Sequence, residues 1–184
     1  LYAMPWANTP YTLETWLEDY VKLRYGMQPN SELFHTLYGA WLRLAKSIYN
    51  CPSNAQQGTT ESVFMMRPAA KPGVVSTWAQ SSWYWDFNEV KAAAHAFLSV
   101  ADTLADNPNY LYDLIDIMRQ CLADEGKNVL DKYSTASTAE RKMLGEKFLT
   151  LLLDQDQLLG TLPDFRFGRW TAMARALGTT EAEK

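Results

Sequence analysis

The sequence contains few of the residues on which metal sites, redox chemistry and disulfide frameworks depend. Of its 184 residues, two are cysteine and two are histidine. Cys51 and Cys121 are enough for one bridge but too few for a disulfide framework, and we expect each to be a lone thiol. His35 and His95 lie far apart, without a Cys, Asp or Glu at metal-ligand spacing. We therefore expect no metal site and no cofactor.

Excess positive charge and long apolar runs are also missing. Lysine and arginine number 17 against 21 acidic residues, a formal net charge of −4, so nucleic acid is not an expected partner. No apolar run approaches the roughly 20 residues that a membrane span needs. The opening LYAMPWANTP has no initiator Met and no signal-peptide pattern, so we expect Leu1 to be a cut inside a longer protein.

The common catalytic motifs are absent from the sequence. It has no G-x-S-x-G, H-E-x-x-H, P-loop or G-x-G-x-x-G. Two pairs of acids, Asp113 with Asp116 and Asp154 with Asp156, are possible acid–base groups. Asp116 lies three residues before Arg119 on an expected helix, which predicts an ion pair. A self-contained active site is not visible.

What is present in abundance is helical periodicity. Apolar residues recur at three- and four-residue steps through most of the chain. Within residues 16–26, we expect the aromatic side chains to enter the core and the charged ones to lie at a solvated edge. The expected helices cover Thr12 to about Tyr25 with a stop at Gly26, about 30–49, Asp86 to Leu104, about 109–133, Ser137 to Leu158, and about 168–177. Two of these begin with capping-box patterns, Asp86 to Glu89 and Ser137 to Glu140.

One long stretch interrupts the helices. Residues 51–85, about 35 in number, show no helical period, and loops of that length are usually functional or disordered. The loop is too rich in Trp, Met and Phe for disorder, so we expect it to lie against another surface. The predicted fold class is all-α: an irregular antiparallel helical bundle with one long aromatic-rich loop, forming a single helical domain over 1–184.

The loop carries the groups that proteins use to bind sugars. Trp and Tyr rings stack on the apolar faces of a pyranose, while Arg, Glu and Asp hydrogen-bond its hydroxyls. The candidates are Glu61, Arg67, Trp78, Trp83, Tyr84 and Asp86. A cluster of Trp is more often a hydrophobic contact between domains than a ligand platform, and composition does not choose between the two.

Several blocks in order carry a resemblance to one family. These blocks are WLEDYVKLRYG, AWLRLAKSIYNC, ES followed by MRP, STW, YLYDLIDIMRQCLA, LLLDQDQLLGT and FRFGRWTAMARALG. Together they resemble the C-terminal region of the α-N-acetylglucosaminidases of glycoside hydrolase family 89, from about Trp16 to Gly178. The family continues with further helical sequence, so we expect Lys184 to be a second cut and the chain a fragment of a larger multidomain glycosidase.

The resemblance implies an exo-acting, retaining hydrolase that removes terminal α-linked N-acetylglucosamine from glycans. Its two catalytic glutamates, about 5–5.5 Å apart in a retaining enzyme, belong to an upstream barrel domain. The helical domain contacts that barrel and adds walls to the substrate cleft, so no residue of this chain is expected to be catalytic. Arg67 and Trp78, in the ES–MRP and STW blocks, are expected substrate-binding residues, while a structural ion pair is expected for Arg169.

The resemblance also limits where the protein is found. A lysosomal location holds for animal relatives, and a secreted, periplasmic or cell-surface location is expected for a bacterial one. Two other readings stay open. In the first, the chain is a non-catalytic carbohydrate-binding module that uses the Trp-rich loop. In the second, it is a helical protein-interaction domain.

Overall fold

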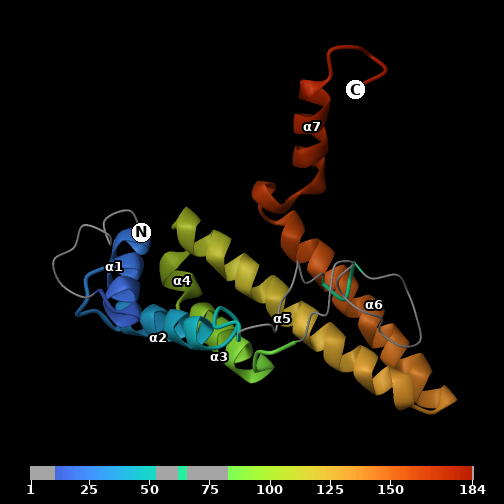
Figure 1. Cartoon of the computed structure of the whole chain (residues 1–184), viewed down its shortest axis with the longest axis horizontal. Coiled ribbons are helices and arrows are strands. Elements are labelled where there is room, and N and C mark those ends of the chain that lie inside the picture. Colours follow the sequence, from blue (N-terminus) through green and yellow to red (C-terminus); the bar gives the residue numbers. More distant parts are fainter. Residues whose placement is uncertain (1–10, 53–61, 66–82, 184) are drawn as a thin grey trace. The chain divides into compact units, whose positions relative to one another are not determined.

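A computed structural model describes residues 11–52, 62–65 and 83–183. These residues form seven α-helices and one short 3-10 helix, and none of them lies in a β-strand (Figure 1). The all-α fold class is therefore confirmed. The chain divides into two compact units, each described by itself: residues 1–61 with 74–121, and residues 62–73 with 122–184.

The first two helices begin where the sequence places their caps. α1 (Leu13–Tyr25) starts after Thr12, whose side chain accepts a hydrogen bond from Thr15 N, and it ends at Gly26 with φ of 69°. α2 (Glu32–Lys46) starts after Ser31, whose hydroxyl accepts from Phe34 N. The expected extension of α2 to Tyr49 is wrong, since Ser47 to Tyr49 form turns.

The helix expected over residues 86–104 is wrong as a single element. It forms two helices, α3 (Phe87–Leu98) and α4 (Ala101–Leu104). A continuous helix would use the carbonyl of Phe97 to accept from the amide four residues later. The Tyr110 hydroxyl donates to that carbonyl instead, over 2.6 Å, and Val100 N also donates to it. The buried tyrosine thus supports the break.

The core of the first unit lies among α1, α2, α3 and the start of α5 (Pro108–Thr135). Leu37, Val90, Phe97 and Tyr110 are completely buried. The Phe97 and Tyr110 rings are stacked with centroids 5.8 Å apart. Apolar burial of this kind is the main source of folding stability.

The second unit is built on the second half of α5 and on α6 (Thr138–Gly160), which runs antiparallel to it (Figure 1). Lys147 of α6 donates to Glu125 of α5. The chain continues into the 3-10 helix η2 (Pro163–Phe165) and then α7 (Phe167–Leu177).

The two predicted capping boxes have different outcomes. At α6 the box is confirmed: Ser137 and Glu140 each bond the other's backbone N–H. At α3 it is wrong. Asp86 caps the helix by accepting from Asn88 N over 2.8 Å, but Glu89 accepts from Arg43 of α2 over 2.7 Å. A partner on the neighbouring helix replaces the local backbone N–H.

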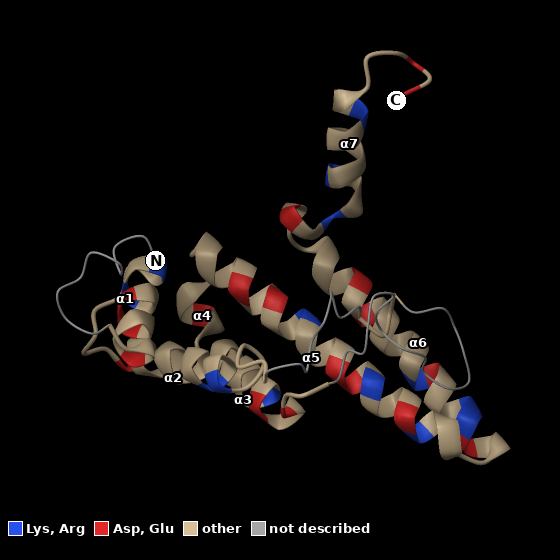
Figure 2. Cartoon of the chain, viewed as in Figure 1, with Lys and Arg blue, Asp and Glu red and all other residues tan. Residues whose placement is uncertain are grey.

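Charge in the described residues is mixed in sign. Acidic and basic side chains both occur along α5 (Figure 2). Among the described residues, no helix is both long and apolar enough to cross a membrane. Neither Cys51 nor Cys121 is part of a disulfide bond.

Candidate functional site

The candidate sugar-binding residues fall on both sides of the boundary of the described structure. Glu61, Arg67 and Trp78 lie outside the described residues. Trp83 and Tyr84 are described and are half-buried at the point where the long loop returns to α3. The structure thus shows how the loop rejoins the first unit.

Tyr84 makes contacts through both its hydroxyl and its ring. Its hydroxyl donates to the carbonyl of Ile48 over 2.7 Å, and its ring meets the edge of Trp85 with centroids 5.2 Å apart. Burial raises the pKa of Tyr84, and a hydrogen bond with the Cys51 thiol acts in the same direction. This tyrosine ties the return of the loop to the turn that follows α2.

Asp86 has a local role in the described structure. Its carboxylate caps α3 through Asn88 N, so one of the oxygens counted for sugar binding already holds the helix start. Trp85 lies beside Phe87 with ring centroids 6.0 Å apart and packs against the core. Part of the aromatic run therefore serves the fold.

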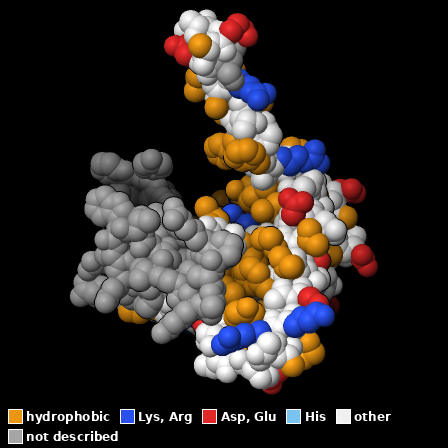
Figure 3. Space-filling view, turned by 90° about the vertical axis from the view of Figure 1, so that its right-hand side faces the viewer, with side chains coloured by type: hydrophobic (Ala, Val, Ile, Leu, Met, Phe, Trp, Pro, Cys, Tyr) orange, Lys and Arg blue, Asp and Glu red, His pale blue; other side chains and the backbone are white. Residues whose placement is uncertain are grey.

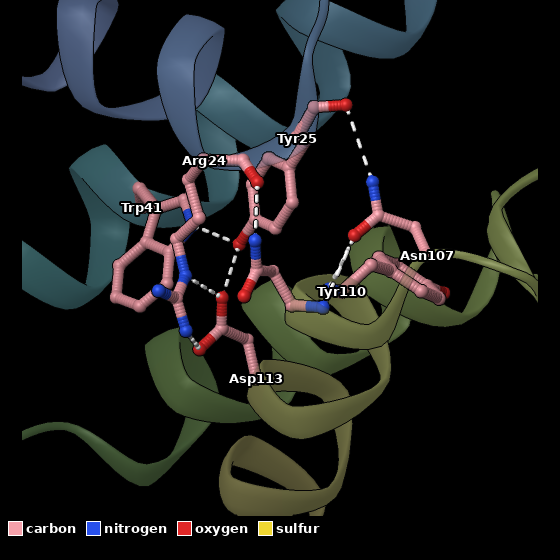
Figure 4. Close-up of polar contacts among 7 residues, drawn as sticks. Arg24, Tyr25, Trp41, Asn107, Tyr110 and Asp113 are labelled. Carbon is pink, nitrogen blue, oxygen red and sulfur yellow. Dashed lines mark hydrogen bonds and ion pairs between the residues drawn. The ribbon is translucent and has the colours of Figure 1, made fainter.

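A network of polar side chains lies inside the first unit. Both oxygens of the buried Asp113 carboxylate accept from Arg24, through Nε and, over 2.6 Å, through Nη2. The same carboxylate accepts from the Tyr25 hydroxyl over 2.6 Å, and that hydroxyl accepts from Trp41 Nε1 over 2.8 Å (Figure 4). Side chains from α1, α2 and α5 thus meet at one carboxylate.

A second set of bonds in Figure 4 joins the same elements through the backbone. Asn107 donates to the carbonyl of Tyr25 over 3.2 Å and accepts from Tyr110 N over 3.1 Å. Asn109 donates to the carbonyl of Arg24 over 2.9 Å. The last turn of α1, whose carbonyls have no partner within the helix, is therefore held by the start of α5.

The network changes the ionisation of its tyrosines. Burial raises the pKa of Tyr25, and the Asp113 carboxylate raises it further by charge and hydrogen bonding. Burial, with a smaller effect of Asp113, raises the pKa of Tyr20 to about 12. Both phenols therefore stay protonated at neutral pH, where neither is suited to act as a base.

Two ion pairs predicted from sequence are confirmed. Arg119 donates to Asp116 three residues earlier, and Arg169 donates to Asp164. The expectation that the charges of residues 16–26 lie at a solvated edge is wrong for Arg24, whose side chain is 26% exposed and bound to Asp113. In the part of the chain that the structure describes, no group of three His, Cys, Asp or Glu side chains is placed to hold a metal ion.

Sequence reasoning missed the role of Arg24, although a signal was present. Arg24 follows Leu17 by seven residues and Val21 by three, so it lies on the buried face of α1. A charge on such a face requires a partner. Nothing in the sequence indicates which acid this is, because Asp113 lies 89 residues away.

Comparison with known proteins gives a consistent result. The profile described as the alpha-N-acetylglucosaminidase (NAGLU) C-terminal domain matches residues 16–184. Human alpha-N-acetylglucosaminidase is 28% identical, over 97% of this chain and 23% of its own length. The fold described above is thus that of the all-helical C-terminal domain of a glycoside hydrolase.

Two solved structures from Clostridium perfringens are similar along the whole fold. One is a family 89 glycoside hydrolase with two glutamates replaced by glutamine, in complex with its substrate GlcNAc-alpha-1,4-galactose. It has a TM-score of 0.85 and 28% identity, covering 100% of this chain and 21% of that one. The other is a family 89 glycoside hydrolase in complex with PUGNAc, with a TM-score of 0.83 and 30% identity, covering 97% and 20%.

The chain belongs to the alpha-N-acetylglucosaminidase C-terminal domain family. It spans about a fifth of the length of the relatives that it matches.

Proposed function

We propose that this chain is the helical, cleft-forming portion of an exo-acting, retaining α-N-acetylglucosaminidase. The complete enzyme hydrolyses terminal α-linked N-acetylglucosamine, and its catalytic glutamates lie in a barrel domain outside this chain. The observation that carries the proposal is the match of the C-terminal domain profile to residues 16–184. The substrate named for one Clostridium perfringens relative, GlcNAc-alpha-1,4-galactose, supports the substrate class.

The bonding of the described acids supports a non-catalytic role for the chain. Asp113 is held by Arg24 and Tyr25, and Asp116 is paired with Arg119. In retaining glycosidases, the two catalytic carboxyl groups face each other across space for a sugar ring. Asp113 and Asp116 are each bound to an arginine and do not form such a facing pair.

A surface of α7 supports contact with another part of the enzyme. Figure 3 shows hydrophobic side chains on this helix. Phe167, Trp170, Met173 and Leu177 are 80%, 63%, 55% and 85% exposed, and they recur at the three- and four-residue steps of one helix face. Contiguous apolar surface of this kind marks an interaction site. We propose that the rest of the enzyme, including its barrel domain, covers it.

Substrate binding is proposed for five residues of the long loop. Arg67 hydrogen-bonds a sugar hydroxyl or an acidic group, and Trp78 stacks on the N-acetyl group or on the leaving sugar. Glu61, Trp83 and Tyr84 complete the set. Because the Tyr84 hydroxyl already donates to Ile48, we propose that the ring of Tyr84 makes the contact with the sugar.

The first experiment compares the complete polypeptide with this chain alone. The substrate is 4-nitrophenyl α-N-acetylglucosaminide, and proton NMR follows the anomer that is released first. Turnover by the complete polypeptide with release of the α anomer, and no turnover by the chain alone, is the expected result. A complete polypeptide without this activity, or one that releases the β anomer, contradicts the proposal.

The second experiment tests the loop residues in the complete polypeptide. Arg67→Ala and Trp78→Ala are expected to lower kcat/KM at least about tenfold, since each removes a contact to the sugar. Arg43→Ala is the control, because Arg43 pairs with Glu89 on the surface of the first unit. Unchanged kcat/KM with unchanged Tm removes both residues from the site.

Binding by the chain alone separates the two other readings. N-acetylglucosamine titrated into the chain, with Trp fluorescence as the signal, is expected to give no saturable change. Tight binding would favour a carbohydrate-binding module. Size-exclusion chromatography with cross-linking tests association with a partner chain.

A further inference from the structure

The turn that follows α2 carries an exposed aromatic ring. Tyr49 is 61% exposed, and its backbone N–H donates to the carbonyl of Leu44 over 3.0 Å, which fixes the turn. Its ring lies nearly parallel to that of Trp41, at an angle of 17° and with centroids 6.4 Å apart. Trp41 is itself held in place, because its Nε1 donates to the Tyr25 hydroxyl over 2.8 Å (Figure 4). A rigid support therefore lies behind a ring that solvent reaches.

An ion pair on α5 lies near this ring. Asp116 accepts from Arg119, and the two side chains are 35% and 47% exposed. Burial raises the pKa of Tyr49, and the charges of Asp116 and Asp113 raise it further. The charge of Arg119 acts in the opposite direction, so the phenol lies within electrostatic range of the whole pair. Because Asp113 is bound to Arg24, the surface around the ring combines two carboxylates with two guanidinium groups.

The same turn anchors a residue for which substrate binding is already proposed. The Tyr84 hydroxyl donates over 2.7 Å to the carbonyl of Ile48, the residue directly before Tyr49. Both tyrosines belong to the first unit, and so do Asp116 and Arg119. One segment of backbone therefore positions two tyrosines within a single unit of the fold.

An open ring beside an ion pair is suited to a hydroxylated sugar. The C–H groups on one face of a pyranose pack against an aromatic ring, while carboxylates and guanidinium groups bond its hydroxyls. An acidic sugar would lose to Asp113 and Asp116 what it gains from the arginines, so the balanced charge suits a neutral sugar. The core of a protein–protein interface is depleted of charged residues, and a surface with two ion pairs does not match that composition.

The exposure of the ring indicates which sugar it contacts. In an exo-acting enzyme, the terminal sugar is enclosed at the catalytic carboxyl groups, while the sugar that carries it stays joined to the rest of the glycan. We propose that Tyr49, Asp116 and Arg119 bind this leaving sugar, a neutral pyranose, and the proposal rests on the proposed function. The Tyr49 ring stacks on one face of the sugar, and the ion pair bonds its hydroxyls. The other side stays open, so that the glycan can continue into solvent.

Two substrates separate the leaving sugar from the terminal one. GlcNAc-alpha-1,4-galactose has a pyranose as its leaving group, whereas methyl α-N-acetylglucosaminide has only a methoxy group. Both are given to the complete polypeptide, and release of N-acetylglucosamine measures kcat/KM. Tyr49→Ala removes the ring, Tyr49→Phe keeps it, and Arg119→Met removes the guanidinium group. Leu98→Ala, at a residue of α3 that is 43% exposed, is the matched surface control.

Tyr49→Ala and Arg119→Met are each expected to lower kcat/KM for the disaccharide about fivefold or more, because each removes a contact to the leaving sugar. For the methyl glycoside, both variants are expected to stay within about twofold of the wild type, since no second sugar reaches the surface. Tyr49→Phe is expected to keep most of the disaccharide activity, and Leu98→Ala to match the wild type on both substrates. If Tyr49→Ala fails to fold, Arg119→Met decides the question by the same comparison.

Failure of this proposal is distinguishable from failure of the proposed function. An active wild type whose Tyr49→Ala and Arg119→Met variants match Leu98→Ala on the disaccharide overturns the leaving-sugar site and leaves the proposed function standing. Equal losses on the two substrates also overturn it, and a lower Tm in the same variants would show that another domain of the enzyme covers this surface. A wild type that releases N-acetylglucosamine from neither substrate overturns both proposals.

Discussion

Arg24 and Asp113, 89 residues apart in the sequence, form a two-point ion pair within the first unit. The Asp113 side chain is 6% exposed, and its Oδ2, which accepts from Arg24 Nε, also accepts from the Tyr25 hydroxyl. Two-point pairing between arginine and a carboxylate is directional as well as strong. The pair therefore fixes the end of α1 against the start of α5.

Replacement of Arg24 by methionine is expected to destabilise the chain strongly. The change leaves the Asp113 carboxylate buried without its cation, which costs about 3–5 kcal/mol in comparable sites. Urea unfolding followed by far-UV circular dichroism measures the loss. Arg119→Met is the surface control, expected to cost no more than about 1 kcal/mol, because its pair with Asp116 is 47% and 35% exposed. Equal losses in the two variants would contradict a buried role for Arg24.

Removal of the Tyr110 hydroxyl is expected to weaken the break between α3 and α4. Tyr110→Phe keeps the ring stacked on Phe97 but removes the 2.6 Å bond to the Phe97 carbonyl. The expected loss of unfolding free energy is about 1–2 kcal/mol, from one buried hydrogen bond. Tyr49→Phe, at a residue that is 61% exposed, is expected to stay within about 0.5 kcal/mol of the wild type. A Tyr110→Phe variant as stable as the control would show that the hydroxyl is not needed.

Helix positions were predictable because their signals are local. Thr12 and Gly26 determine the ends of α1 through bonds and backbone angles within a few residues, and Ser137 with Glu140 does the same for α6. The break at Val100 was not predictable in this way. It depends on Tyr110, which reaches back from the next long helix to the Phe97 carbonyl.

The site followed the same rule. The order of sequence blocks indicated the family, which the match to residues 16–184 confirms, while the substrate-binding role of the loop stays a prediction. The contact between the Phe64 ring and Gly126 was not predictable, because the two residues are 62 apart in the sequence and no local pattern links them. Contacts between distant residues depend on tertiary packing, which periodicity does not specify.

Stability is expected to fall as the pH rises from about 10 to about 12. The folded state raises the pKa of Tyr20 from 10.0 to about 12, mainly by burial, and Asp113 adds to the effect. Between these values the unfolded state releases the proton first, so alkali favours unfolding. Below pH 10 the contribution of Tyr20 to stability is fully present. It is lost as the pH rises through the folded-state pKa of Tyr20, about 12. Tyr25, whose pKa is also raised, contributes in the same direction.

Tyr20→Phe tests this contribution. The variant keeps the ring contacts to Trp16 and Trp41, both with centroids 5.2 Å away, but has no proton to release. Urea midpoints measured from pH 9 to pH 12 are expected to fall less steeply for the variant than for the wild type. If the urea midpoints of the variant and the wild type fall equally steeply with pH, the loss of stability in alkali comes from groups other than Tyr20.

The apolar face of α7 is expected to matter only in the complete enzyme. In this chain Trp170 and Leu177 are 63% and 85% exposed, so changing both to serine is expected to alter its unfolding free energy by less than about 0.5 kcal/mol. In the complete polypeptide the same double variant is expected to lose about 2 kcal/mol or more, because the apolar side chains that the rest of the enzyme covers are then missing.

The matched control places serine on the opposite face of α7, at Ala172 and Ala176. These substitutions are expected to change the free energy of unfolding only slightly, both in the chain alone and in the complete polypeptide. Urea unfolding of the chain and of the complete polypeptide, each with both double variants, gives the four comparisons. Equal losses for the Trp170 and Leu177 variant in the two proteins would mean that the rest of the enzyme does not cover this face. The proposed contact with the barrel domain would then need a different surface of the chain.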